Sequence, residues 1–453
     1  MTRSGTLLFL TVVFAISFGL VSHAQLLQPP QQPPPTAPGA STSPPIALTL
    51  SDAIARGVRQ NVTARVQEAD LVAARGDRWS AMKDLLPTAS ARLAYSRQVI
   101  NLAVFGFTLP GVPSIVGPFN LHDARLFVSQ PIVDLHALYE SRSSAANLRA
   151  AEFVTKDTRS LVTLAVRDLY LQAVAGESRL VAARAQSDTA RALLTQATDL
   201  RNAGVSAGID VIRAQVQSHL QDQRVIVTLN EFEKEKLQLA RAIGLPLDRP
   251  ISLVDQIPYA PLDGMPLEAA LQQALSARDD YRAAQERFQA AQASRRAAIS
   301  DNLPSLHLNA DYGEIGNIPA NTHSTFLVAA EVRIPIFDSA TTRGHLLETE
   351  GLVERRRAEL DDFRAGVEYE VRAAYLDVHA ADEALQTAKE TMDLANQELT
   401  QSRDRFAAGV TGNLEVVQAQ ESVANATDQY ISSLYAHNAA KAALAHAIGG
   451  TIP

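Results

Sequence analysis

The sequence predicts a mainly helical fold with a small antiparallel β part, built by internal tandem duplication. Three observations predict this class. The chain from about residue 48 to 451 is written twice, a seven-residue pattern of apolar and small residues runs through most of each copy, and short stretches of alternating character lie between the helical segments. A single copy would leave its apolar faces uncovered, so we expect the two copies to pack side by side.

The two copies align almost without gaps. Pairs at a spacing of 217 residues include Leu50 with Leu267, Leu86 with Leu303 and Tyr95 with Tyr312. Pairs at a spacing of 205 residues include Val166 with Val371, Gly204 with Gly409 and Ile243 with Ile448. The sequence therefore predicts a first repeat over 48–247, a linker over 248–264 and a second repeat over 265–453.

The segment before the repeats has the features of a secretory signal peptide. Arg3 precedes an apolar run over 7–21, and Ser22-His23-Ala24 is a cleavage site of the small-x-small type. We expect a signal peptide over 1–24, and the alternative interpretation is an uncleaved anchor. Residues 25–47 are rich in Pro and Gln, which favours an extended leader.

Composition excludes several classes of protein. The chain has no cysteine, which excludes disulfides, thiolate metal sites and cysteine nucleophiles. Its net charge of -8 is modest, and no basic cluster with interleaved aromatics is present, so we expect no nucleic-acid partner. An exported chain without a long apolar helical stretch can still be a membrane protein as a β-barrel.

The seven-residue pattern predicts two very long helices, over about 137–203 and 340–408. Apolar or small residues alternate at steps of three and four, as at Val367, Val371, Ala374 and Val378, which is typical of coiled-coil packing. At 1.5 Å per residue each helix measures roughly 100 Å. Each ends at a glycine-containing turn before a returning helix. Shorter helices are expected over about 51–85 and 267–302.

Period-two stretches predict four strands per chain in two hairpins. Ala124, Leu126 and Val128 alternate with polar residues, and a similar alternation covers 327–334. The preceding strands are expected over about 89–98 and 305–314. Four strands cannot close a barrel, and open edges in lipid leave polar groups unpaired, so a membrane location requires oligomers. Two, three or four chains would give eight, twelve or sixteen strands.

Aromatic residues gather in this strand region. Interfacial anchoring in a membrane is one interpretation. Phe127 falls on the polar register, and for this residue a packed position facing a lumen is the other interpretation.

This arrangement resembles the TolC family of outer membrane efflux proteins over essentially the whole mature sequence. The resemblance rests on the duplicated order of helix, hairpin, long helix, glycine turn and returning helix, and on the endings Arg241-Ala242-Ile243-Gly244 and His446-Ala447-Ile448-Gly449. It implies a homotrimer in which twelve strands form an outer membrane β-barrel and twelve helices continue it as an α-helical barrel across the periplasm. It also implies a periplasmic adaptor protein and an inner-membrane transporter as partners.

The resemblance assigns roles to the two glycine turns. As periplasmic tips that contact the adaptor, they would present six residues: Gly204, Val205, Gly208, Gly409, Val410 and Gly412. The alternative is that these glycines only cap helices.

The resemblance also places the narrowest part of the passage near the second turn. Four positions align with that segment: Phe406, Thr411, Glu415 and Gln418. Phe406 and Thr411 stand where the best-known member has a tyrosine and an arginine that help to close the entrance, so a closed state held by the same bonds is not expected. Three copies of Glu415 would form a negative ring, and a solvated carboxylate near a helix start is the alternative.

No catalytic, cofactor-binding or metal site is predicted. Gly204-Val205-Ser206-Ala207-Gly208 matches a hydrolase nucleophile pattern, but a helix rather than a strand enters it. The histidines are scattered without ligand spacing. The expected function is a passive exit duct for efflux or type I secretion, and the alternative is a periplasmic coiled-coil adaptor or structural protein.

Overall fold

The structure is a computed structural model that describes residues 44–450 apart from 107–110, 112, 257–258, 260, 262–263 and 337–338. The expected signal peptide and most of the expected leader lie outside the described residues. The predicted class, mainly helical with a small sheet, is confirmed. The strands are β1 (Ile46–Leu48), β2 (Thr88–Asn101), β3 (Ile115–Val133), β4 (Ile251–Leu253), β5 (Ser305–Ile318) and β6 (Asn321–Arg333). The helices are α1 (Leu50–Gln60), α2 (Val62–Ala81), α3 (Leu135–Asn202), α4 (Gly208–Ala242), α5 (Leu267–Ala277), α6 (Asp279–Ser300), α7 (Ser339–Ala407) and α8 (Asn413–Ala447).

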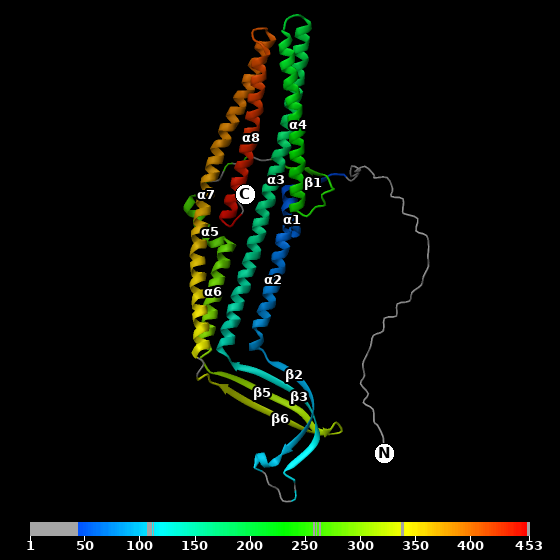
Figure 1. Cartoon of the computed structure of the whole chain (residues 1–453). Helices are drawn as coiled ribbons and strands as arrows, with labels where there is room; N and C mark the ends of the chain where they lie inside the picture. Colours follow the sequence, from blue (N-terminus) through cyan, green and yellow to red (C-terminus); the bar gives the residue numbers. More distant parts are fainter. Residues whose placement is uncertain are drawn as a thin grey trace, which may run out of the picture. The chain divides into compact units, whose positions relative to one another are not determined.

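The two long helices match the heptad prediction closely. α3 has 68 residues and α7 has 69, and each turns back into a helix of 35 residues, α4 or α8. Figure 1 shows the resulting hairpins, α3 with α4 and α7 with α8, extending away from the sheet. Asp134 caps the start of α3, and its carboxylate accepts a hydrogen bond from the Ala137 N–H at 2.9 Å.

Each of the shorter helices is divided in two, which differs from the prediction of continuous helices over 51–85 and 267–302. The first breaks at Asn61 and the second at Arg278, where the backbone is extended. The Asn61 side-chain oxygen accepts a hydrogen bond from the Thr63 N–H, and its side-chain NH2 donates to the carbonyl of Ala242 at 3.0 Å. The break therefore allows Asn61 to contact the end of α4, and local helix propensity alone does not predict it.

All four long strands form one antiparallel sheet in the order β2-β3-β5-β6. β3 and β5 are neighbours, so the middle of the sheet joins the first repeat to the second. β2 and β6 are the edges. As Figure 1 shows, this sheet continues from the end of the helices opposite the two turns.

Each repeat has its own apolar core halfway along the helices. We call these regions the first junction and the second junction. The first contains Val166, Tyr170 and Ile243, and the second contains Val371 and Ile448. A two-stranded parallel sheet, β1 with β4, covers the first junction. The expected start of the first repeat at residue 48 falls inside β1.

Both junctions use the same turn at the end of the returning helix. Gly244 follows α4 with φ +69°, and Gly449 follows α8 with φ +67°. The next N–H bonds back to the helix in each case, Leu245 to Ala240 at 2.8 Å and Gly450 to Ala445 at 3.0 Å. This is the Schellman arrangement, which needs a left-handed residue and so favours glycine.

Candidate functional site

One face of the four-stranded sheet is an exposed apolar surface. Leu126, Tyr312 and Phe326 lie side by side on adjacent strands, and their exposed fractions are 50 %, 58 % and 77 %. The next rung on the same face contains Val128, Ala310 and Val328. A face of this kind indicates a surface that another apolar phase or molecule covers.

The opposite face of the sheet is polar and internally bonded. The Arg125 guanidinium pairs with Asp311 and donates to Thr325 Oγ1 at 2.9 Å. Phe127 lies on this face, as its register predicts, and the Arg92 guanidinium stacks over its ring at 5.3 Å from the centroid. The alternation read from the sequence therefore separates the faces correctly.

The two turns between the long helices have the same backbone geometry. Gly204 has φ +74° and Gly409 has φ +71°, and the following N–H bonds five residues back in both turns, Val205 to Leu200 at 2.9 Å and Val410 to Arg405 at 3.0 Å. The glycines thus cap helices, as one of the two interpretations requires. Val205 and Val410 are each 69 % exposed, so both turns present an uncovered apolar side chain.

Gly208 and Gly412 differ in position. Gly208 is the first residue of α4, whereas Gly412 precedes the first turn of α8. Neither has a positive φ, and no side chain closer than 3.9 Å would meet an added Cβ at either position. Backbone strain therefore does not require glycine at these two sites.

A buried asparagine links the two turns. Asn413 at the start of α8 is fully buried, and its amide donates to the carbonyl of Asp210 in α4 at 2.9 Å. The Asp210 side chain is also buried and accepts a hydrogen bond from Ser206 at 2.9 Å. This bond gives Ser206 a structural partner, in a turn that α3 enters.

The four residues expected at the passage fall into two groups. Phe406 is only 5 % exposed and packs with Leu193 and Val416 within the protomer. Gln418 is exposed. Glu415 lies 3.6 Å from the Arg405 guanidinium of the preceding helix, with both side chains partly exposed. Thr411 is half-buried.

Charged residues concentrate at the second junction, which the sequence did not reveal. Arg278, at the break between α5 and α6, donates to both carboxylate oxygens of Asp280, at 3.0 and 2.6 Å, and to Glu370 of α7 at 2.5 Å. Burial and the nearby Asp280 raise the pKa of Asp157 on α3 to about 6. Burial and Arg278 lower the pKa of His446 on α8. Asp157 at the second junction therefore changes its charge in the mildly acidic range.

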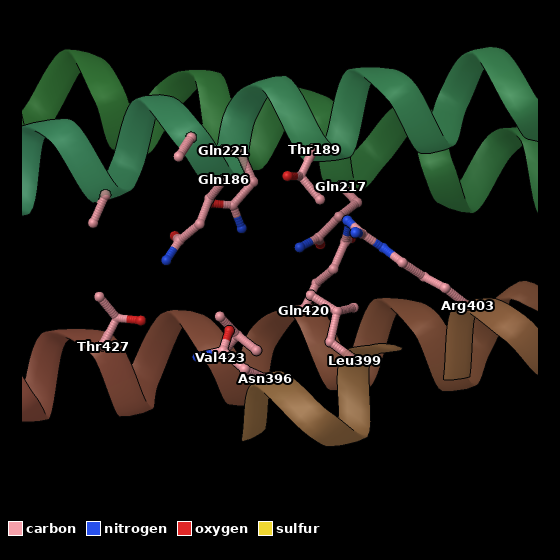
Figure 2. Close-up of a pocket in the computed structure, with 12 residues that line it drawn as sticks. Gln186, Thr189, Gln217, Gln221, Asn396, Leu399, Arg403, Gln420, Val423 and Thr427 are labelled. Atoms are coloured by element: carbon pink, nitrogen blue, oxygen red, sulfur yellow. The ribbon is translucent and has the colours of Figure 1, made fainter. Parts of the chain in front are cut away.

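A cavity of about 360 Å³ separates the two hairpins on the side of the junctions nearer the turns. Figure 2 shows glutamine side chains entering it from α3, α4 and α8. Gln217, Gln221 and Gln420 are each less than a tenth exposed. In the sequence, this site corresponds to two glutamines four residues apart in the helical stripe that includes Ala214, a stripe that apolar residues usually fill.

Among the residues that the structure describes, no group of three or more histidine or carboxylate side chains is placed to hold a metal ion. No helix in the same part of the chain combines the length and the apolar composition needed to cross a membrane.

Comparison with known proteins gives consistent matches. Residues 270–450 match the model of the family described as outer membrane efflux protein. The chain is 28 % identical to the pyoverdine export outer membrane protein OpmQ of Pseudomonas putida, over 72 % of this chain and 70 % of that protein. It is 21 % identical to the alkaline protease secretion protein AprF of Pseudomonas aeruginosa, over 70 % and 67 % of the two chains.

Solved structures show the same fold. The outer-membrane channel OprN superposes with a TM-score of 0.76 at 20 % identity, covering 89 % of this chain and 90 % of that one. The outer membrane protein VceC from Vibrio cholerae superposes with a TM-score of 0.77 at 16 % identity, covering 88 % and 96 %. The likeness extends over the sheet and the helical hairpins together.

Proposed function

We propose that this chain belongs to the outer membrane efflux protein family, whose model its residues 270–450 match, and that it is the exit duct of an efflux or secretion system, with its sheet in the outer membrane and its helices in the periplasm. The observation that carries this proposal is the four-stranded sheet, which has one apolar exposed face, one polar face and two open edges. A duct needs these three properties, because lipid covers one face, water wets the other and further copies pair with the edges.

The open edges support a homotrimer. β2 and β6 each expose a row of backbone donors and acceptors, which in lipid would cost several kcal/mol per unpaired group. Pairing β6 of one copy with β2 of the next closes twelve strands from three copies. The polar face with Arg125 and Asp311 would then line a water-filled bore.

The mass and the conductance of the purified complex test this assembly. A detergent-extracted complex with the mass of three chains, which produces single-channel currents in a planar bilayer, is the expected result. A stable single chain without ion flow would refute it. The alternative function, a periplasmic adaptor or structural protein, predicts recovery of the chain in the soluble periplasmic fraction.

The exposed turns support contact with a periplasmic adaptor that links the duct to an inner-membrane transporter. Val205 and Val410 present similar uncovered side chains on equivalent backbones, so both repeats offer the same kind of contact. A photoreactive amino acid at either position should crosslink to an adaptor in cells. The matched control is the same amino acid at Val181, which is 62 % exposed on α3 away from the turns.

The position of Glu415 supports a role for this residue in the ion selectivity of the duct. It lies at the start of α8 near the second turn and is partly exposed, so three copies would place three carboxylates around one passage. Glu415→Gln should lower the preference for cations in bilayer recordings. Glu268→Gln on α5 makes the same change of charge far from the turn and is the control. Equal selectivity of both variants would remove the ring from the proposal.

A further inference from the structure

The cavity between the hairpins contains buried amide groups that have no hydrogen-bond partner. Five atoms are in this state: Gln186 Oε1, Gln217 Nε2, Gln221 Oε1, and both Oε1 and Nε2 of Gln420. An unpaired buried polar atom costs about 1–3 kcal/mol. Five such atoms around one space of about 360 Å³ therefore indicate that something polar occupies it.

The unpaired atoms come from both hairpins. Gln186 belongs to α3, Gln217 and Gln221 belong to α4, and Gln420 faces them from α8. An occupant would bond the two hairpins at the same time. Its hydrogen-bonding must be mixed, because the unpaired atoms comprise two amide nitrogens that donate and three amide oxygens that accept.

The charged residue that lines the cavity indicates the charge of the ligand. Arg403 of α7 reaches into the cavity, and Figure 2 shows its guanidinium directed toward Gln217. Arg403 is exposed and forms no ion pair with the residues that the structure describes, and no carboxylate lines this space. A guanidinium with a free fork of donors fits a carboxylate group.

We propose that this cavity is a binding site for a small organic molecule that carries one carboxylate and an amide or hydroxyl group. The carboxylate pairs with Arg403, and the second polar group bonds the amides of Gln217, Gln221 and Gln420. The volume is at the lower end of the range for small-molecule sites, which limits the ligand to a compact molecule. The site lies between the two hairpins of one protomer, and its proposal does not rest on the proposed function.

Two matched probes test the proposal on the full-length purified protein. N-acetylglycine carries a carboxylate and an amide, and N-acetylglycinamide is its uncharged counterpart. We expect N-acetylglycine to bind more tightly in ligand-observed NMR and to raise Tm in proportion to its occupancy. Arg403→Gln should weaken N-acetylglycine about tenfold and leave the neutral probe unchanged. Arg357→Gln, at an exposed position elsewhere on α7, is the control.

Gln420→Leu provides the second test. It removes both unpaired amide atoms and keeps the size of the side chain, so the ligand-free variant should be at least as stable as the wild type. The rise in Tm with N-acetylglycine should be lost. Equal rises in the wild type and in Gln420→Leu, or equal binding of the two probes, would overturn the proposal in favour of an ordered water cluster.

Discussion

The first and second junctions have the same backbone but different chemistry. In both repeats a short helix is broken at equivalent positions, Asn61 and Arg278. A glycine in the left-handed conformation packs against each break, Gly244 in the first repeat and Gly449 in the second. The first break is held by neutral amide hydrogen bonds. The second is held by a guanidinium between two carboxylates. The two repeats thus share the backbone of the turn but stabilise the break with different side-chain interactions.

The largest expected loss of stability is at the two glycines, Gly244 and Gly449, that follow the returning helices. A Cβ on Gly449 would lie 2.9 Å from the Arg278 nitrogen and 3.0 Å from the Ala277 carbonyl carbon, which are backbone atoms. Gly449→Ala should lower the stability by about 3 kcal/mol, through the left-handed φ and the clash together. In Gly244→Ala the added Cβ meets the Gln60 side chain at 2.8 Å, and about 2 kcal/mol is expected. Thermal denaturation of both variants measures the difference; the reverse order would contradict it.

The next effect concerns two tyrosines at equivalent positions. The Tyr170 hydroxyl is buried and lies 2.9 Å from the Leu48 carbonyl oxygen of β1, which accepts its hydrogen bond. Tyr170→Phe leaves that buried carbonyl with one partner fewer and should cost about 2 kcal/mol. Tyr375 is half-buried and contacts His379 through its ring, so Tyr375→Phe should change the stability little. Similar losses in both variants would show that the junctions do not differ here.

The pH dependence should belong to the second junction. Burial raises the pKa of Asp157 from 3.8 to about 6, so the folded protein binds this proton more tightly than the unfolded chain. The contribution of Asp157 to stability therefore falls as pH rises from 3.8 to about 6 and stays low above that. Because the side chain is partly exposed, solvent screening reduces the effect to roughly 1 kcal/mol.

Asp157→Asn should abolish that fall in stability, so the variant should be more stable than the wild type at pH 8 and similar at pH 4. Asp362→Asn, at the exposed equivalent position of the second repeat, is the control. Denaturation midpoints measured across this pH range decide the matter. Parallel curves for wild type and Asp157→Asn would place the titration elsewhere.

The smallest effect tests where the repeats remain alike. Gly204 and Gly409 share the left-handed φ, and an added Cβ would meet no atom within 4 Å at either position. Alanine at each should cost about 1 kcal/mol, and the two losses should agree. A clear difference between the two variants in denaturation would show that one turn is packed by contacts that the other lacks.

The sequence predicted the long elements well, because their patterns are local and repeated. The heptad spacing placed the ends of α3 and α7 within about two residues, and the alternation around Leu126 assigned the faces of the sheet. The breaks at Asn61 and Arg278 could not be predicted, because neither residue is Gly or Pro and each break meets the end of a returning helix, α4 at Ala242 and α8 at Gly449. The packing of Phe406 against Leu193 could not be predicted either, because it depends on how the hairpins meet.

The pairing of β3 with β5 has a consequence for synthesis of the chain. The partners of Leu126 and Val128 on β5, Tyr312 and Ala310, are translated more than 180 residues later. Until then the nascent chain carries a two-stranded hairpin with an apolar face and an unmatched margin, which is prone to mispairing. The four-stranded sheet needs strands from both repeats. A chain that ends after the first repeat therefore leaves the edge of β3 unpaired. We therefore expect the unfinished polypeptide to need a chaperone during synthesis.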